Sequence, residues 1–195
     1  MHLLEAAGVI TGLVCVWLAA RENIWNWAFG IATAVCYIVV FTQAKLYADA
    51  GLQVFYIGIS VYGWWNWLFG GSDRSELPVT RVRFPESLRL ALVTAVSTAT
   101  LMLLLRRFTD STVPFWDALT TSMSLVAQYM LGRKQIENWW LWMAADVIYV
   151  ALYVYKSLYL TAGLYVVFFA LCILGLVRWQ KDLRAPDVAN AEAAG

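Results

Sequence analysis

Charged side chains are scarce in this sequence, and their scarcity excludes an ordinary soluble domain. The 195 residues include 14 Lys and Arg and 13 Asp and Glu, so 14% are charged, whereas soluble domains average about a quarter. Hydrophobic residues make up 62% of the chain, and the mean hydropathy is +0.64. This balance predicts an integral membrane protein in which little chain remains for a soluble domain.

Residues that carry enzyme chemistry are also few. The single histidine is His2 at the terminus, and Cys15, Cys36 and Cys172 lie in apolar stretches at a spacing that matches no metal site. The sequence contains no P-loop or other glycine-rich phosphate cradle, and no Ser/His/Asp or Cys/His set can be assembled in the membrane. We therefore expect a protein that is not an enzyme, with no catalytic residue, metal or cofactor, and no ATP-driven transport of its own. The basic residues lie in short loops and form no patch, so no nucleic-acid partner is expected.

What the sequence has instead is a series of apolar stretches. A bilayer core of about 30 Å needs about 20 such residues for each helix that crosses it. Seven stretches meet this length approximately, which predicts an all-α membrane protein with seven transmembrane helices. The expected helices are Leu3–Ala20, Ile24–Gln43, Leu46–Leu68, Ser87–Leu105, Phe115–Leu131, Asn138–Tyr155 and Leu158–Trp179.

The distribution of Lys and Arg predicts the orientation of these helices. Ten of the fourteen basic residues fall on one side of the predicted membrane, and the positive-inside rule assigns that side to the cytoplasm. The N-terminus is then outside and the C-terminus inside. The four basic residues on the outer side are Lys45, Arg106, Arg107 and Lys156.

An internal repeat relates the first three helices to the last three. A shift of 112 residues without a gap superimposes matching residues along both triplets, among them Arg21 on Arg133, Asn26 on Asn138, Trp27 on Trp139, Tyr37 on Tyr149 and Gly63 on Gly175. One helix separates the triplets, so both cross the membrane in the same sense, as parallel repeats in a 3+1+3 arrangement. The predicted parts are residues 1–68 as the first repeat, 69–110 as a cytoplasmic loop and connector helix, 111–181 as the second repeat, and 182–195 as a disordered cytoplasmic tail.

A stripe of aromatic residues with one carboxylate marks the sixth helix. Helical spacing puts five side chains on one face, namely Trp139, Trp142, Asp146, Tyr149 and Tyr153. A carboxylate within the bilayer costs about 2.5–3.5 kcal/mol unless a partner or a polar cavity satisfies it. Asp146 is then either hydrogen-bonded to a Ser, Thr or Gln of a neighbouring helix or is the counter-charge for a cationic substrate or a proton.

Tryptophan and glutamine supply the other candidate binding residues. Trp139, Trp140 and Trp142 are suited to an aromatic cage, since an indole face attracts a cation by about 0.5–2 kcal/mol. Most tryptophans lie near helix ends where a membrane interface would also place them, and that reading is favoured for Trp25, Trp64, Trp65 and Trp179. Binding is favoured slightly over packing for Gln43 and Gln53, whose amides suit ribose hydroxyls or a carboxamide.

At these residues the chain resembles the PnuC family of bacterial vitamin transporters, from Gly8 to Lys181. The resemblance rests on four motifs: NWxxG at Asn26–Gly30, QAKLYADxGLQ at Gln43–Gln53, YGWxxW at Tyr62–Trp67 and ENWWLW at Glu137–Trp142. The WWxW pattern at Trp139, Trp140 and Trp142 is similar to the family's pattern for nicotinamide riboside, and Gln43 matches a binding position.

The resemblance implies a fold like that of the SWEET sugar transporters and a function in the bacterial inner membrane. It implies facilitated diffusion of nicotinamide riboside by alternating access, trapping of the product by a cytoplasmic riboside kinase, contact with membrane lipid, and scope for a homo-oligomer. Asp146 stands where we expect some members to carry an amide, so thiamine and riboflavin remain alternative substrates. A membrane scaffold subunit without a substrate is the alternative from another class.

Overall fold

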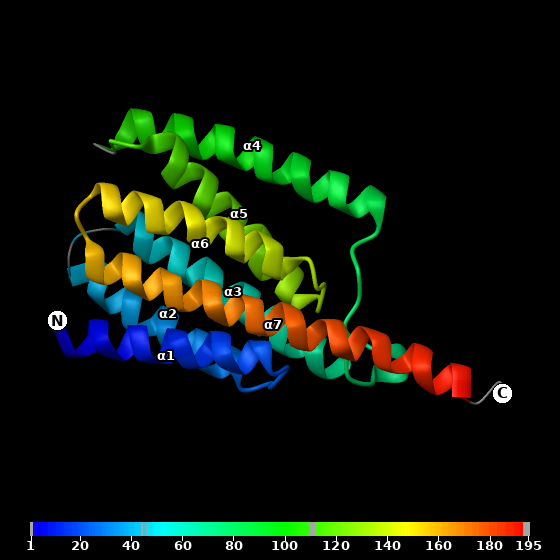
Figure 1. The fold of residues 1–195 in the computed structure, drawn as a ribbon. Helices are drawn as coiled ribbons and strands as arrows, with labels where there is room; N and C mark the ends of the chain where they lie inside the picture. The colour runs from blue at the N-terminus through cyan, green and yellow to red at the C-terminus, as the bar shows by residue number, and fades with distance from the viewer. Residues whose placement is uncertain (1, 44, 46, 110–111, 193–195) are drawn as a thin grey trace. The chain divides into compact units, whose positions relative to one another are not determined.

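The computed structural model describes residues 2–43, 45, 47–109 and 112–192. Within these residues the chain forms seven α-helices and one short 3-10 turn (Figure 1). The all-α prediction of seven helices is thus confirmed. The elements are α1 (His2–Ala20), α2 (Asn26–Gln43), α3 (Tyr47–Phe69), η1 (Ser72–Arg74), α4 (Phe84–Phe108), α5 (Pro114–Gly132), α6 (Asn138–Tyr155) and α7 (Tyr159–Glu192).

The observed helices differ most from the predicted ones at the C-terminal end. The prediction ends the last helix at Trp179 and makes 182–195 a disordered tail, but α7 continues through Glu192. The segment after Lys181 is rich in Ala, which has the highest helix propensity, and this favours continuation of the helix. The boundaries of the four predicted parts otherwise stay a prediction.

Several helices have the composition of membrane spans. Among the described residues, four segments are long and apolar enough to cross a bilayer: Leu3–Ala20, Asn26–Gln43, Phe84–Phe108 and Tyr159–Arg184. Helices α3, α5 and α6 have 23, 19 and 18 residues, so they are of similar length. They are rich in Trp, Tyr, Ser, Thr and amide side chains, which is the composition expected of helices that line a polar interior.

Two compact units can be distinguished within the chain. The first comprises residues 1–79, 132–134 and 174–195, and the second comprises residues 80–131 and 135–173. In the first unit α2 packs against both α1 and α3. Three buried indoles form the centre of its packing: Trp27 meets Trp67 edge to face at 5.3 Å between ring centroids, and Trp67 lies 6.0 Å from Trp179. The interface reading of Trp179 is therefore wrong, since its side chain is 0% exposed within the protein.

The second unit contains α4, α5, α6 and the first part of α7. The loop before α4 is fixed to the start of α6, because the N–H of Ile136 donates to Thr80 O at 3.0 Å and the N–H of Val82 donates to Glu137 Oε2 at 3.0 Å. Helix α4 itself is exposed along much of its length, with Leu88, Leu92 and Leu103 each more than 60% exposed. An apolar helix with so little cover inside the protein is suited to contact with lipid.

The 112-residue repeat is visible in local geometry as well as in sequence. Asn26 and Asn138 are both 0% exposed, and each donates from Nδ2 to the main-chain carbonyl three residues earlier, at 2.9 and 2.7 Å. Four residues at matching loop positions take the left-handed conformation, with φ of 54° at Glu22, 48° at Lys134, 60° at Lys45 and 58° at Ser157. Equivalent segments of the two triplets therefore fold in the same way at both ends of α2 and α6.

Candidate functional site

The aromatic stripe of α6 is half-buried to buried within the second unit. Asp146 is 4% exposed and Trp139 is 1% exposed, whereas Trp142 and Tyr149 are half-buried. Trp140 lies off this face by one residue and is 58% exposed. The three predicted cage residues therefore differ: Trp139 is packed, Trp142 is partly exposed, and Trp140 points away from the stripe. Trp142 alone of the three lies on the face of Asp146 and is partly exposed, as Tyr149 is.

Asp146 has a hydrogen-bond partner on the neighbouring helix. The Sγ of Cys172 on α7 lies 3.6 Å from Asp146 Oδ2, and the thiol donates to the carboxylate. A Ser, Thr or Gln partner was one of the two alternatives that the sequence left open for Asp146, and no chemistry was expected of the cysteine. A thiol is a weak donor and occupies one of the roughly four acceptor positions of a carboxylate. The remaining acceptor capacity of Asp146 is what a polar or cationic ligand could use.

A cluster of tyrosines continues the stripe beyond Asp146. Tyr149 lies 4.5 Å from Tyr165 and 6.1 Å from Tyr153 between ring centroids, and Tyr153 lies 5.3 Å from Tyr165. Phe168 of α7 meets Tyr165 edge to face at 5.8 Å. On α5, Thr120 and Ser124 are hydrogen-bond partners of the Tyr149 side chain. Three helices thus build one aromatic surface with several hydroxyl groups on it.

Tyr165 and Phe168 are the site residues that sequence reasoning missed. On α7 they precede Cys172 at helical spacing, with Tyr165, Phe168 and Cys172 at i, i+3 and i+7. The same face that supplies the partner of Asp146 therefore supplies the aromatic neighbours of Tyr149. A search for this spacing on α7 would have found the stripe, but it could not have paired it with α6.

Gln43 and Gln53 belong to the first unit. Gln43 is the last residue of α2 and is exposed, and Gln53 is half-buried on α3. Gln53 lies on the same face of α3 as Ser60, Gly63 and Trp67, because these residues are spaced at i, i+7, i+10 and i+14. Both amides belong to a different unit from the α6 stripe, and their role in binding stays a prediction.

The first repeat presents a less polar version of the α6 stripe. The residues of α2 that match Trp142 and Asp146 are Gly30 and Ala34, while Tyr37 matches Tyr149. Tyr37 stacks on Phe41 with centroids 5.6 Å apart, much as Tyr149 stacks on Tyr153. The tyrosine at the end of the stripe is common to both repeats, but the indole of Trp142 and the carboxylate of Asp146 occur in the second repeat alone.

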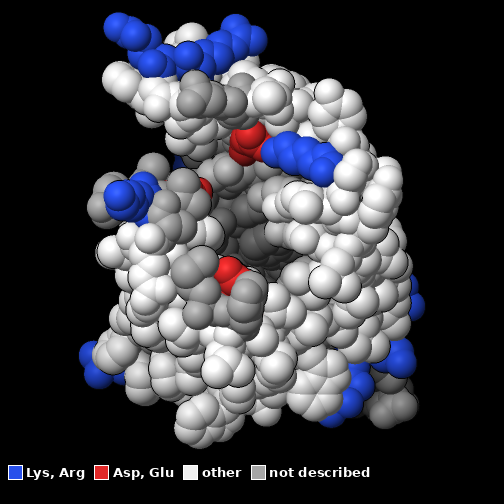
Figure 2. Space-filling model, turned by 90° about the vertical axis from the view of Figure 1, so that its left-hand side faces the viewer, with Lys and Arg blue, Asp and Glu red and all other residues white. Residues whose placement is uncertain are grey.

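The charges of the helices favour a ligand that is not an anion. Helices α1, α2, α3, α5 and α6 contain no Lys or Arg in their sequences. On the face drawn in Figure 2, uncharged side chains predominate, and Lys and Arg stand in separate groups instead of one patch. Among the described residues no group of three or more His, Cys, Asp or Glu could hold a metal ion. The site can therefore contact a ligand through aromatic stacking, through hydrogen bonds and through the charge of one carboxylate.

Comparison with known proteins gives this arrangement a context. The model of a family described as nicotinamide mononucleotide transporter matches residues 2–181. The chain belongs to this family. It is a multi-pass membrane protein of a bacterial transporter family, as the motifs at Gln43–Gln53 and Glu137–Trp142 indicated.

Relatives within the family differ in the substrate that their names state. The nicotinamide riboside transporter PnuC of Escherichia coli (strain K12) is 28% identical over 93% of this chain and 86% of its own length. The riboflavin/roseoflavin transporter RibM of Streptomyces davaonensis is 27% identical over 97% of this chain and 90% of its own length. A crystal structure of the vitamin B3 transporter PnuC matches with a TM-score of 0.73 and 23% identity, covering 94% of this chain and 83% of that one. That structure supports the fold.

Proposed function

We propose that this protein carries nicotinamide riboside across the bacterial inner membrane. The observation that carries the proposal is the α6 and α7 surface, where Trp142, Asp146 and the tyrosine cluster combine aromatic faces with one buried carboxylate. Nicotinamide riboside has a cationic pyridinium ring, a carboxamide and ribose hydroxyls. The indole and tyrosine faces suit the cation, and Asp146 is its counter-charge.

The charge pattern favours the riboside over the mononucleotide in the family's description. A phosphate dianion in a low-dielectric site needs Arg, Lys or a helix N-terminus directed at it. The five helices α1, α2, α3, α5 and α6 carry no basic residue, and α6 places a carboxylate in the stripe. The unphosphorylated vitamin therefore matches the available groups better.

The transport mode that we propose is facilitated diffusion. With no nucleotide-binding motif in the sequence, transport is either facilitated or ion-coupled. The resemblance to the PnuC family favours facilitated diffusion, by alternating access between two parallel repeats with the N-terminus outside. A cytoplasmic riboside kinase maintains the gradient by phosphorylating the product. The other binding residues predicted from the sequence are Trp139, Trp140, Gln43 and Gln53, and their role stays a prediction. Trp139 is 1% exposed and supports the stripe by packing, whereas Trp140 is 58% exposed and lies off its face.

Riboflavin transport is the second candidate, and the RibM relative favours it because it matches 97% of this chain. The isoalloxazine ring of riboflavin is flat and uncharged, so it could use the aromatic surface without needing Asp146. The two candidates therefore differ in their dependence on this carboxylate. Binding of thiamine, which is cationic, should depend on Asp146 as binding of nicotinamide riboside does.

The test measures binding of each compound to the purified protein by quenching of tryptophan fluorescence. We expect nicotinamide riboside to bind, with an affinity that falls about tenfold or more in Asp146→Asn, since 1.4 kcal/mol of lost attraction corresponds to a tenfold change. The control is Asp49→Asn, which removes an exposed carboxylate in the first turn of α3. Quenching by riboflavin or by thiamine, with no response to nicotinamide riboside, would refute the assignment.

Uptake into proteoliposomes separates a carrier from a scaffold. We expect Trp142→Ala and Gln43→Ala to lower the initial rate of nicotinamide riboside uptake while the folded protein is still recovered. Trp65→Ala, which removes an indole that is 67% exposed on α3, is the matched control and should leave uptake unchanged. A wild-type protein that is folded and gives no uptake of any vitamin would favour the scaffold.

A further inference from the structure

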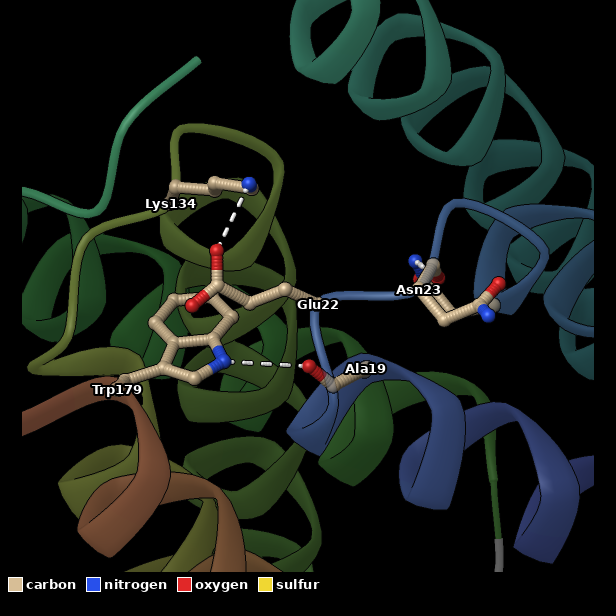
Figure 3. Close-up of polar contacts among 6 residues, drawn as sticks. Ala19, Glu22, Asn23, Lys134 and Trp179 are labelled. Atoms are coloured by element: carbon tan, nitrogen blue, oxygen red, sulfur yellow. Dashed lines mark hydrogen bonds and ion pairs between the residues drawn. The ribbon is translucent and has the colours of Figure 1, made fainter. Parts of the chain in front are cut away.

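Two loop residues from different repeats form a partly buried ion pair. Lys134, between α5 and α6, donates from Nζ to Glu22 Oε2, between α1 and α2, at 2.9 Å (Figure 3). The two positions are 112 residues apart, which is the repeat spacing, so they are equivalent positions of the two triplets. Parallel repeats in transporters are related by an axis along the membrane normal, and a contact between equivalent positions of two such repeats lies on that axis.

Both residues occupy backbone positions that favour glycine. Glu22 and Lys134 have φ of 54° and 48° at the ends of α1 and α5. The N–H of Asn23 donates to Leu18 O at 2.9 Å, and the N–H of Gln135 donates to Met130 O at 3.0 Å, as in the usual left-handed helix termination. A side chain in this conformation carries a backbone cost that glycine avoids. Glu22 and Lys134 therefore carry long charged side chains at positions where glycine would fit the backbone better, and they differ from Lys45, which shares the conformation, in being paired with each other.

The pair is enclosed by aromatic rings of the first unit. The side chains of Lys134 and Glu22 are 8% and 21% exposed. The Lys134 ammonium lies 4.7 Å from the centroid of the Trp67 ring, and Trp179 donates from Nε1 to Ala19 O at 3.2 Å beside the pair (Figure 3). Lys134 is thus held by a carboxylate on one side and an indole face on another. An ammonium in such surroundings loses most of its water and depends on these two partners.

The charge of Glu22 depends on Lys134 in turn. Burial raises the pKa of the Glu22 carboxyl, the hydrogen bond and charge of Lys134 lower it, and the Asp182 carboxylate raises it again. Without the ammonium, two carboxylates would face each other in a partly dry site. Removing either member of the pair therefore leaves the other poorly satisfied.

We propose that Glu22 and Lys134 form the cytoplasmic gate of the transporter. This inference rests on the proposed function and on the predicted orientation, which places both loops at the cytoplasmic side. Transporters built from repeats place their substrate at the repeat interface. An ion pair between equivalent loops, sealed by Trp67 and Trp179, closes that axis at the cytoplasmic end. Release of substrate requires the pair to separate, and its re-formation returns the carrier to the outward-facing state.

The experiment compares binding and transport of nicotinamide riboside in neutralised and charge-swapped variants. We expect Glu22→Gln and Lys134→Met to keep the dissociation constant within about threefold and to lower the maximal uptake rate about tenfold or more, because a population shift of 1.4 kcal/mol is tenfold. Glu22→Lys combined with Lys134→Glu restores the opposite charges and should recover uptake to within about threefold of wild type. The control is Lys45→Met, which removes an exposed lysine in the same left-handed conformation at the other end of the repeat.

Three outcomes overturn the gate: uptake at the wild-type rate in both neutralised variants, a folded charge swap that transports no better than they do, or loss of binding in parallel with transport. If the variants do not fold, hydrogen exchange of the wild-type protein decides. Saturating nicotinamide riboside must then change the exchange of amides at 21–24 and 133–136 relative to those at 156–158, and identical exchange overturns the gate. A wild-type protein that neither binds nor transports nicotinamide riboside refutes the proposed function instead.

Discussion

Gly63 offers the sharpest test of how the first unit is packed. A Cβ added at this position of α3 would meet the ring of Trp27, which is 1% exposed and fixed edge to face against Trp67. Gly58, five residues earlier on the same helix, has no atom within 4 Å of the place where a Cβ would stand, apart from its chain neighbours and the backbone of its own helix. The two glycines therefore differ in available space and share their helix.

The expected magnitude follows from two opposing effects. Gly→Ala within a helix is favourable by about 1 kcal/mol through helix propensity, and this gain is common to both positions. Overpacking a rigid site costs about 1–3 kcal/mol, and this cost falls on Gly63 alone. The difference between Gly63→Ala and Gly58→Ala is therefore about 1–3 kcal/mol. At about 2–4 °C per kcal/mol for a chain of this size, it corresponds to roughly 2–12 °C in apparent Tm.

Thermal unfolding of the purified variants in one detergent, at one scan rate, measures this difference, since irreversible unfolding makes Tm depend on scan rate. Gly63→Ala should unfold below wild type or close to it, and Gly58→Ala at or above it. Displacement of Trp27 would also disturb the ring of Trp67 that covers Lys134, so uptake should fall in the first variant alone. Equal Tm values for the two variants would show that the α2 and α3 contact is looser than described and would refute the reasoning.

Three further predictions concern the α6 and α7 surface and the repeat. Cys172→Ser keeps a donor to Asp146 and should retain binding of nicotinamide riboside, whereas Cys172→Ala should weaken it; Cys36→Ala, at a half-buried cysteine of α2, is the control in the same fluorescence titration. Tyr165→Ala removes the ring that joins Tyr149 and Tyr153 and should lower affinity several-fold, while Tyr159→Ala, at a tyrosine that is 67% exposed, should have little effect. Asn26→Ala and Asn138→Ala each remove a buried hydrogen bond and should each lower stability by about 1–3 kcal/mol, measured as apparent Tm; a loss at one position without the other would contradict their equivalence.

The fold was predictable because its main determinants are local. Apolar stretches of the length of a bilayer core gave the seven helices, and the matched motifs at Asn26 and Asn138 gave the repeat. The end of α7 was not predicted, since Pro186 and the polar residues near it are unfavourable in a helix, whereas the alanines around them favour one.

The site was predictable on one helix and not between helices. Spacing along α6 put Trp142, Asp146 and Tyr149 on one face, and burial of Asp146 agrees with that face being directed inward. The residue that meets Asp146 depends on how α7 is rotated about its axis, and spacing along the sequence does not determine that rotation. Cys172 was therefore passed over, and Tyr165 with it. The pairing of Glu22 with Lys134 was hidden for the same reason, although the repeat had already aligned their neighbours Arg21 and Arg133.

The two repeats differ at the matching positions, since the first has Gly30 and Ala34 where the second has Trp142 and Asp146. This difference implies that the two halves took different roles after duplication. One half could acquire side chains for a new cargo while its twin kept small residues at the matching positions. Vitamin preference could then drift through a few substitutions on a single helix, and the matching turns at both ends of α2 and α6, which the two halves share, would be left intact.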